Sequence, residues 1–194
     1  MNDLVALAAE LDQFIADRGW SGCIIGGIAN LRWGEPRLTR DVDATIVTGF
    51  GNEARFIRVL LDRFPSRIPD AAAFAQVNRV LLLASDAGIP IDIALGGLPF
   101  EEEMVGRATR AELAPNIFVR TVSAEDFVVL KAFAARDRDW LDIAGVAARQ
   151  RDSLDWEAIL VRLQPLVELK EEPEILVRLR AVRRQHERAP SSDV

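Results

Sequence analysis

Three aspartates in the first half of the chain have the residue type and spacing of a metal-binding site. Asp41 and Asp43 lie two positions apart in residues 41–47, where alternating polar and apolar residues predict a β-strand. Residues two apart on a strand project from the same face, so we expect the two carboxylates to be close neighbours. Asp92 lies in a second apolar segment, residues 89–95, which also predicts a strand.

Two like charges side by side are unfavourable unless a cation neutralises them. A hard divalent ion would do so, because Mg²⁺ commonly binds one or two carboxylates together with the phosphates of a substrate. The alternative is that Asp41 and Asp43 face solvent on an edge strand. The aspartates taken alone leave both interpretations open.

A glycine pair precedes the acidic strand. Gly26 and Gly27 follow a predicted buried strand at residues 23–25 and precede a predicted short helix at residues 28–33. Backbone N–H groups at the start of a helix favour a phosphate, whereas an isolated glycine pair more often forms a tight turn. The combination of the pair with the later Asp41 and its neighbours is more informative than either feature alone.

The segment from Gly26 to Asp43 resembles the polymerase-β-like nucleotidyltransferase superfamily, in which a Gly-Gly or Gly-Ser pair precedes Asp-x-Asp on a strand. It is most similar to the AbiEii-type branch, the toxin-like nucleotidyltransferases of abortive-infection and toxin–antitoxin systems. Arg37 and Thr39 match the Arg-x-Ser/Thr of that branch. Asp92 matches its third carboxylate.

A second stretch, residues 123–143, resembles the same branch. Its acidic helix start is followed by Lys131 in a mostly apolar helix, and then by a charged group comprising Arg136, Arg138, Asp139 and Asp142. Lys131 either extends from the rim of the core or contacts a triphosphate. The two aspartates either face solvent, form ion pairs with Arg136 or Arg138, or act as a structural clamp beside an active site.

The resemblance implies a metal-dependent nucleotidyltransferase that moves a nucleoside monophosphate from an NTP to an acceptor hydroxyl. The acceptor would belong to tRNA or protein, and the enzyme would be a toxin with a cognate antitoxin. The implied ligands of Mg²⁺ or Mn²⁺, which are also catalytic together with Lys131, are Asp41, Asp43 and Asp92. The implied nucleotide-binding residues are Gly26, Gly27, Arg37, Thr39 and Lys131.

Two other functions fit the same residues. One is a small-molecule nucleotidyltransferase of the aminoglycoside-modifying kind, and the other is a non-catalytic nucleotide-sensing module. The presence of all three carboxylates argues against the module. A predicted last helix is rich in arginine and either faces solvent or contacts RNA or an antitoxin; its arginines are Arg178, Arg180, Arg183, Arg184 and Arg188.

The pattern of elements predicts an α/β (α+β) fold, with a small mixed β-sheet that carries the aspartates and a C-terminal helical bundle. Residues 1–122 alternate between helical and strand patterns and form the predicted nucleotidyltransferase core. Residues 123–194 are helical in pattern and are expected to pack on that core. The final residues, 189–194, predict a frayed tail because Pro190 cannot continue a helix.

Composition narrows the functional classes. The 194 residues carry a net charge of −6, which argues against a duplex-DNA binder. The apolar stretches are far shorter than a membrane span, and we see no basic leader segment. One cysteine and one histidine exclude a structural zinc site, and the single cysteine excludes an intrachain disulfide. Together these features predict a cytoplasmic protein without a membrane partner.

Overall fold

The computed structural model describes residues 2–187. Arg188 and the predicted tail at residues 189–194 lie outside the described residues. The chain divides into two compact units. The first, here called the sheet unit, comprises residues 1–32 and 37–123, and the second, the helical unit, comprises residues 33–36 and 124–194. The predicted packing of the helical part on the core stays a prediction.

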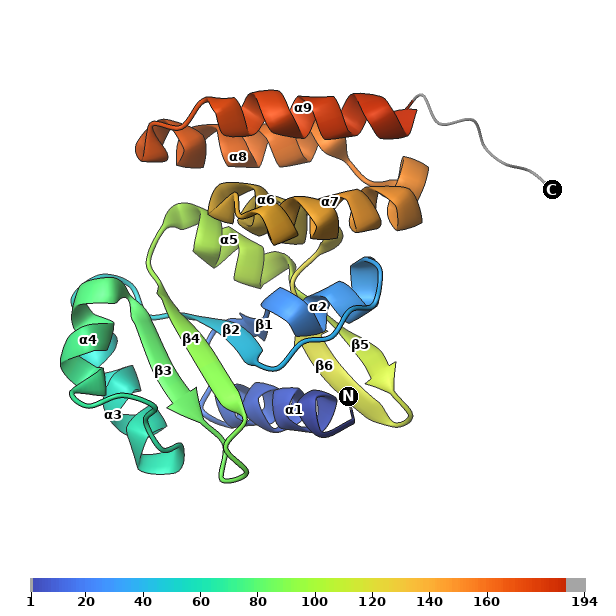
Figure 1. Cartoon of the computed structure of the whole chain (residues 1–194). Helices are drawn as coiled ribbons and strands as arrows, with labels where there is room; N and C mark the ends of the chain where they lie inside the picture. The colour runs from blue at the N-terminus through green and yellow to red at the C-terminus, as the bar shows by residue number, and fades with distance from the viewer. Residues whose placement is uncertain (1, 188–194) are drawn as a thin grey trace. The chain divides into compact units, whose positions relative to one another are not determined.

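The sheet unit contains a mixed sheet of six strands within the described residues (Figure 1). The strands are β1 (Gly22–Ile24), β2 (Val42–Val47), β3 (Val80–Ala84), β4 (Pro90–Gly96), β5 (Thr109–Ala114) and β6 (Ile117–Thr121). Their order is β3-β4-β2-β1-β6-β5. β2 pairs with β4 in parallel, as β1 does with β6, whereas the other neighbours are antiparallel.

The strand β5 was not predicted from the sequence. It is an edge strand, and its residues are exposed or half-buried, so it lacks the apolar alternation that marks a strand with one buried face. A register shift between Glu112 and Ala114 further disturbs its pairing with β6. β3 and β4 form an antiparallel hairpin.

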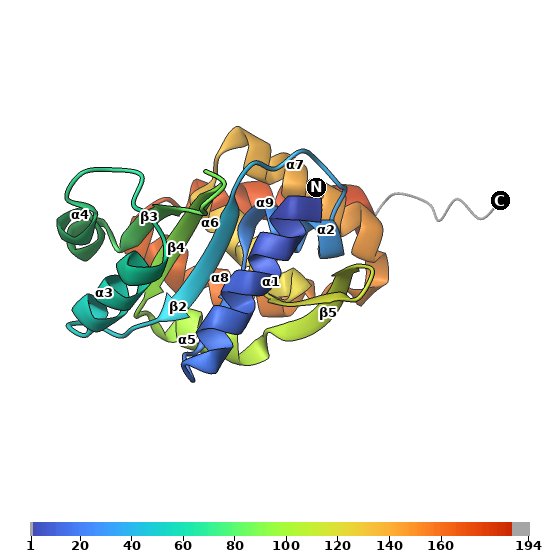
Figure 2. The same ribbon diagram turned by 90° about the horizontal axis from the view of Figure 1, so that it is seen from below.

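Three helices of the sheet unit, at residues 2–17, 53–63 and 71–78, cover one face of the sheet. The helices of this unit are α1 (Asn2–Asp17), α2 (Gly26–Trp33), α3 (Glu53–Arg63), α4 (Ala71–Asn78) and α5 (Pro99–Arg107). Figure 2 shows α1 crossing the sheet beside β2. The buried core joins apolar residues of α1, α3 and α4 to one face of the strands, among them Leu11, Phe56, Leu60, Val42, Ile46, Leu81 and Ile93.

The opposite face of the central strands is polar. On β2 the buried Val42, Ala44 and Ile46 point to the core, so the intervening Asp43 projects from the other face. On β4 the same alternation places Asp92 on that face as well. The sequence pattern of these two strands therefore sets the side of the sheet on which the carboxylates meet.

The helical unit consists of α6 (Ala124–Ala134), α7 (Asp137–Gln150), α8 (Trp156–Lys170) and α9 (Glu174–Glu187), with a 3-10 turn at Arg151–Ser153. Within the described residues, these elements confirm the helical pattern predicted after residue 123. The short segment at residues 33–36 belongs to this unit because α7 holds its backbone. Arg149 donates to the carbonyl of Gly34 at 2.7 Å, and Gln150 donates to the carbonyl of Trp33 at 2.8 Å.

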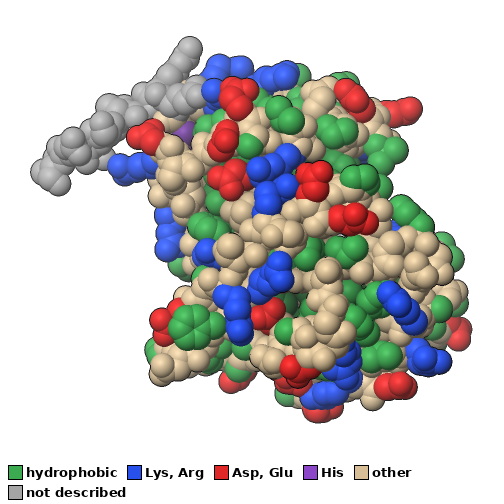
Figure 3. Space-filling model, turned by 180° about the vertical axis from the view of Figure 1, so that it is seen from behind, with side chains coloured by type: hydrophobic (Ala, Val, Ile, Leu, Met, Phe, Trp, Pro, Cys, Tyr) green, Lys and Arg blue, Asp and Glu red, His purple; other side chains and the backbone are tan. Residues whose placement is uncertain are grey.

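The described residues confirm a mixed α/β fold with C-terminal helices. Between residues 2 and 187, no helix combines the length and hydropathy of a membrane span. Acidic and basic side chains are interspersed on the face of the molecule that Figure 3 shows.

Candidate active site

The structure places Asp43 and Asp92 opposite each other on neighbouring strands. β2 and β4 run parallel, and their register pairs these two residues directly. Both are half-buried, so neither carboxylate is fully hydrated. Asp41 lies immediately before β2, two residues from Asp43 and also half-buried. Three negative charges therefore lie around the start of β2, and their mutual repulsion must be offset by a cation.

One such cation is Arg67, whose guanidinium forms an ion pair with Asp92. Burial raises the pKa of Asp92, the positive charge of Arg67 lowers it, and the negative charge of Asp41 raises it again. The pKa of Asp92 lies above its ordinary value as a result. Folding therefore makes the Asp92 carboxyl harder to ionise than an aspartate in water.

Asp41 is held by the buried Thr39. The Thr39 hydroxyl donates to Oδ1 of Asp41 at 2.8 Å. Only 5% of Thr39 is exposed, so this bond is sheltered from water and fixes the orientation of the carboxylate. The predicted role of Thr39 was nucleotide binding, and the contact that the structure shows for its hydroxyl is with Asp41.

The glycine pair allows α2 to begin directly against these residues. Gly26 has a φ of +59°, and a Cβ there would lie 2.6 Å from Cγ of Asp43. A Cβ at Gly27 would lie 2.7 Å from Cβ of Thr39. Both positions need glycine because Asp43 and Thr39 fill the space that a side chain would take. The positive end of α2 also favours the nearby carboxylate of Asp43.

Gly26→Ala is therefore expected to destabilise the protein by more than the roughly 1–2 kcal/mol that a left-handed alanine costs. The matched control is Gly19→Ala, since Gly19 has a φ of +63° and nothing within 4 Å of its would-be Cβ. The difference between the two variants, measured by urea unfolding, isolates the contact with Asp43. Equal losses of stability would show that this contact is unimportant.

The donor chemistry of the three aspartates fits a hard divalent cation, because carboxylate oxygens are the preferred ligands of Mg²⁺. The positions of the three carboxylates do not yet form a complete set of metal ligands. Across residues 2–187, no group of three or more His, Cys, Asp or Glu side chains is arranged to hold a metal ion. Asp92 is bound to Arg67, and one oxygen of Asp41 accepts the hydroxyl of Thr39. The assignment of all three aspartates as metal ligands stays a prediction.

Lys131 belongs to the helical unit, where it is buried and paired with two carboxylates. Its ammonium lies 2.9 Å from Oδ1 of Asp139 and 2.7 Å from Oδ2 of Asp142. Arg136 also pairs with Asp139, at 2.6 Å. Burial raises the pKa of Asp139, but its hydrogen bonds to Arg136 and Lys131 outweigh burial and hold the pKa below the ordinary value. Lys131 thus joins α6 to α7, and its predicted contact with a triphosphate stays a prediction.

The other predicted basic residues have these positions. Arg37 is half-buried, and its guanidinium donates to the carbonyl of Leu38 at 3.3 Å. On α9, Arg183 pairs with Glu157 at 2.6 Å, and the guanidinium of Arg178 lies 4.5 Å from the ring centre of Trp140. These two arginines therefore contribute to packing within the helical unit. The RNA or antitoxin contact of this helix stays a prediction.

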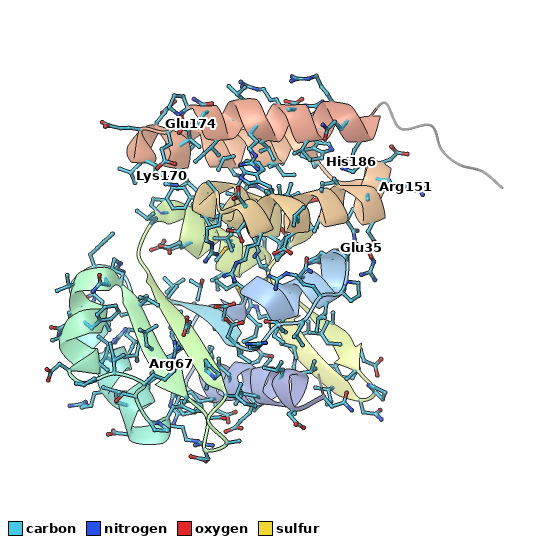
Figure 4. The ribbon with its side chains drawn as sticks, viewed as in Figure 1. Glu35, Arg67, Arg151, Lys170, Glu174 and His186 are labelled. Carbon is cyan, nitrogen blue, oxygen red and sulfur yellow. The ribbon has the colours of Figure 1, made fainter. Side chains whose placement is uncertain are left out.

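Sequence analysis did not identify Arg67. The residue lies in the connection between α3 and α4, and nothing in its local sequence distinguishes it from the other arginines. Arg67 and Asp92 are 25 positions apart in the sequence. They meet because the segment that contains Arg67 runs along β3. Figure 4 labels this side chain over β3 and β4.

Several solved structures resemble the chain at low sequence identity. An antigenic nucleotidyltransferase-like protein from Paracoccidioides brasiliensis is 19% identical, with a TM-score of 0.50, over 93% of this chain and 94% of that one. The antibiotic-resistance factor ANT(2″)-Ia is 16% identical, with a TM-score of 0.46, over 94% and 91% of the two chains. The lincosamide antibiotic adenylyltransferase LnuA, solved with lincomycin, is 11% identical, with a TM-score of 0.45, over 70% and 91%.

Comparison with curated proteins gives no match. The sequence profile of one family does match, and that family is described as "Nucleotidyl transferase of unknown function (DUF2204)". The match runs over residues 5–194. It supports the superfamily resemblance of the acidic strand and glycine pair, while the AbiEii-type branch stays a prediction. Because the match spans nearly the whole chain, the protein belongs to this family of nucleotidyl transferases and is an enzyme of the nucleotidyltransferase class.

Proposed function

We propose that the protein transfers a nucleoside monophosphate from an NTP to an acceptor hydroxyl in a reaction that requires Mg²⁺ or Mn²⁺. The observation that carries the proposal is the pairing of Asp43 with Asp92 on adjacent strands, with Asp41 beside them and the start of α2 against Asp43. Carboxylates concentrated in this way are suited to binding divalent metal together with a polyphosphate.

Asp41 and Asp43 would hold the metal through oxygens on one face of β2, and Asp92 would join them from β4. When bound, the metal supplies positive charge that stabilises the phosphate oxygens and orients the nucleotide. Thr39 keeps the carboxylate of Asp41 in place through its hydroxyl. Gly26 leaves the space in which Asp43 can lie against the start of α2.

In the proposed reaction, the acceptor hydroxyl attacks the α-phosphorus of the NTP in line with the leaving pyrophosphate. A new bond forms between the acceptor oxygen and phosphorus, and the bond between the α- and β-phosphates breaks. Asp92 helps to remove the proton from the acceptor hydroxyl. Backbone N–H groups at Gly26 and Gly27, with Arg37, would contribute to holding the phosphates.

The acceptor in this proposal is a hydroxyl of tRNA or protein, with the enzyme acting in the cytoplasm as a toxin that a cognate antitoxin restrains. The charge of the aspartate group favours a second candidate. Three carboxylates, with Arg67 on one of them, fit a cationic acceptor such as an aminoglycoside by charge complementarity.

The test supplies the purified protein with each α-labelled NTP and Mg²⁺, together with total tRNA, a protein lysate or a panel of aminoglycosides. We expect label to appear in one acceptor pool and pyrophosphate to be released in equal amount. Omission of the metal by chelation should stop transfer. Label in the aminoglycosides alone would replace the first acceptor class with the second, and no transfer to any pool would contradict the proposed function.

A further inference from the structure

Arg67 lies in a row of residues that crosses the sheet on its polar face. Asp43 on β2 pairs in register with Asp92 on β4, and Asp92 pairs in register with Leu82 on β3. Ser66 then forms a bridge with Leu83 at the outer edge of β3, which places Arg67 beside Leu82.

The backbone fixes Arg67 in this position without help from its side chain. The N–H of Arg67 donates to the carbonyl of Leu82 at 3.0 Å, and the N–H of Ala84 donates to the carbonyl of Pro65 at 2.8 Å. The segment thus follows the edge of β3 like a short additional strand. From there the guanidinium passes Leu82 and reaches Asp92.

The Arg67–Asp92 ion pair is only partly sheltered. Their side chains are 32% and 33% exposed, so water and ions can reach both groups. A pair of this exposure is weaker than a buried one and can exchange partners at low cost. The same carboxylate is the third oxygen donor that a metal held by Asp41 and Asp43 would need.

We propose that Arg67 competes with the metal ion for Asp92, so that metal binding at Asp41 and Asp43 breaks the ion pair and recruits Asp92 as a ligand. This inference rests on the metal site of the proposed function. Arg67 acts here as a positioning residue: it neutralises Asp92 until a divalent ion replaces it. Arg67 therefore weakens metal binding and sets the metal concentration at which the full set of ligands assembles.

The test is a titration with Mn²⁺, followed by electron paramagnetic resonance of the free ion, in wild type and Arg67→Ala. We expect Arg67→Ala to bind Mn²⁺ about tenfold more tightly, the scale of one lost charge-assisted hydrogen bond. Arg67→Lys, which keeps the charge, should bind with an affinity closer to that of wild type. Alanine retains the backbone bond to Leu82, so the variant is expected to fold, and circular dichroism checks this.

Loss of any nearby positive charge could strengthen cation binding, and Arg40→Ala controls for that effect. Arg40 is exposed and adjacent in sequence to Asp41, so its removal should change the affinity much less than Arg67→Ala does. Asp92→Asn removes the carboxylate for which the two cations compete. In that background, Arg67→Ala should no longer tighten binding, and the difference between the two backgrounds measures the competition.

Wild type and Arg67→Ala with equal Mn²⁺ affinities would overturn the inference while leaving the metal site intact. An equal gain from Arg40→Ala, or a full gain in the Asp92→Asn background, would also overturn it. If none of the variants binds Mn²⁺, the metal site of the proposed function is wrong, and the inference fails with it.

Discussion

Asp43→Asn is expected to reduce nucleotidyl transfer by at least about a thousandfold while the protein remains folded. A metal ion contributes several kcal/mol to the stabilisation of developing charge, and each 1.36 kcal/mol corresponds to a factor of ten in rate. Asparagine keeps the size of the side chain, so the close approach to Gly26 is preserved. The substitution also removes one of two like charges that lie opposite each other on β2 and β4.

The measurement is single-turnover transfer from an α-labelled NTP, with thermal melting of the same samples. Asp86→Asn is the matched control, because Asp86 lies in the turn between β3 and β4 with 81% of its side chain exposed. It should retain the wild-type rate. Transfer by Asp43→Asn within threefold of wild type would remove Asp43 from the catalytic machinery.

Lys131→Met is expected to destabilise the helical unit by about 3–5 kcal/mol, the cost of removing one partner from a buried ion pair. Methionine keeps the length of the apolar stem but leaves Asp139 and Asp142 without the cation that lies within 3 Å of both. Their side chains are 0% and 3% exposed, so water cannot replace it effectively. Urea unfolding followed by circular dichroism measures the loss, and hydrogen exchange assigns it to α6 and α7.

Lys170→Met provides the control for this substitution, since Lys170 is the only other lysine in the sequence. Its ammonium pairs with Glu172 at 2.8 Å, but its side chain is 28% exposed, so the cost should be about 1 kcal/mol or less. Equal losses from the two variants would contradict a structural role for Lys131. Transfer measured under conditions in which Lys131→Met remains folded tests the catalytic role separately.

The effect of Lys131→Met should also depend on pH. The pKa of Asp139 is held below its ordinary value of 3.8, so the ionised carboxylate stabilises the folded state above about that pH. This contribution is lost as the pH falls through the lowered folded-state pKa. Unfolding measured from pH 7 down to pH 2.5 should therefore show a full difference between wild type and variant at pH 7 and a smaller one at the acid end.

The sequence by itself determined the strands other than β5, most helices and the face on which the acidic residues project. Strict alternation around Asp43 and Asp92 allows only one buried face on β2 and β4, because side chains of a strand point alternately to opposite sides. The helices at residues 124–187 follow from their apolar periodicity in the same way. These features are local, so short-range patterns are sufficient to predict them.

Only the tertiary structure decided which partner each charged residue has. The pairing of Asp43 with Asp92 requires β2 and β4 to be neighbours in the sheet. The two strands lie far apart in the sequence: Thr48 and Gly96, which are in contact just beyond the paired residues, are separated by 48 positions. Arg67 reaches Asp92 because its segment runs along the edge of β3, and edge strands such as β5 leave little signal in the sequence.

Lys131 is a second residue whose partners the sequence alone did not determine. The resemblance implies a contact with nucleotide, which stays a prediction, and the fold of α6 and α7 places the ammonium between Asp139 and Asp142. A lysine in an apolar helix looks the same in sequence whether its charge meets a phosphate or a carboxylate. Coulomb interactions depend on distances in space, and those distances are set by the packing of elements that a local pattern does not specify.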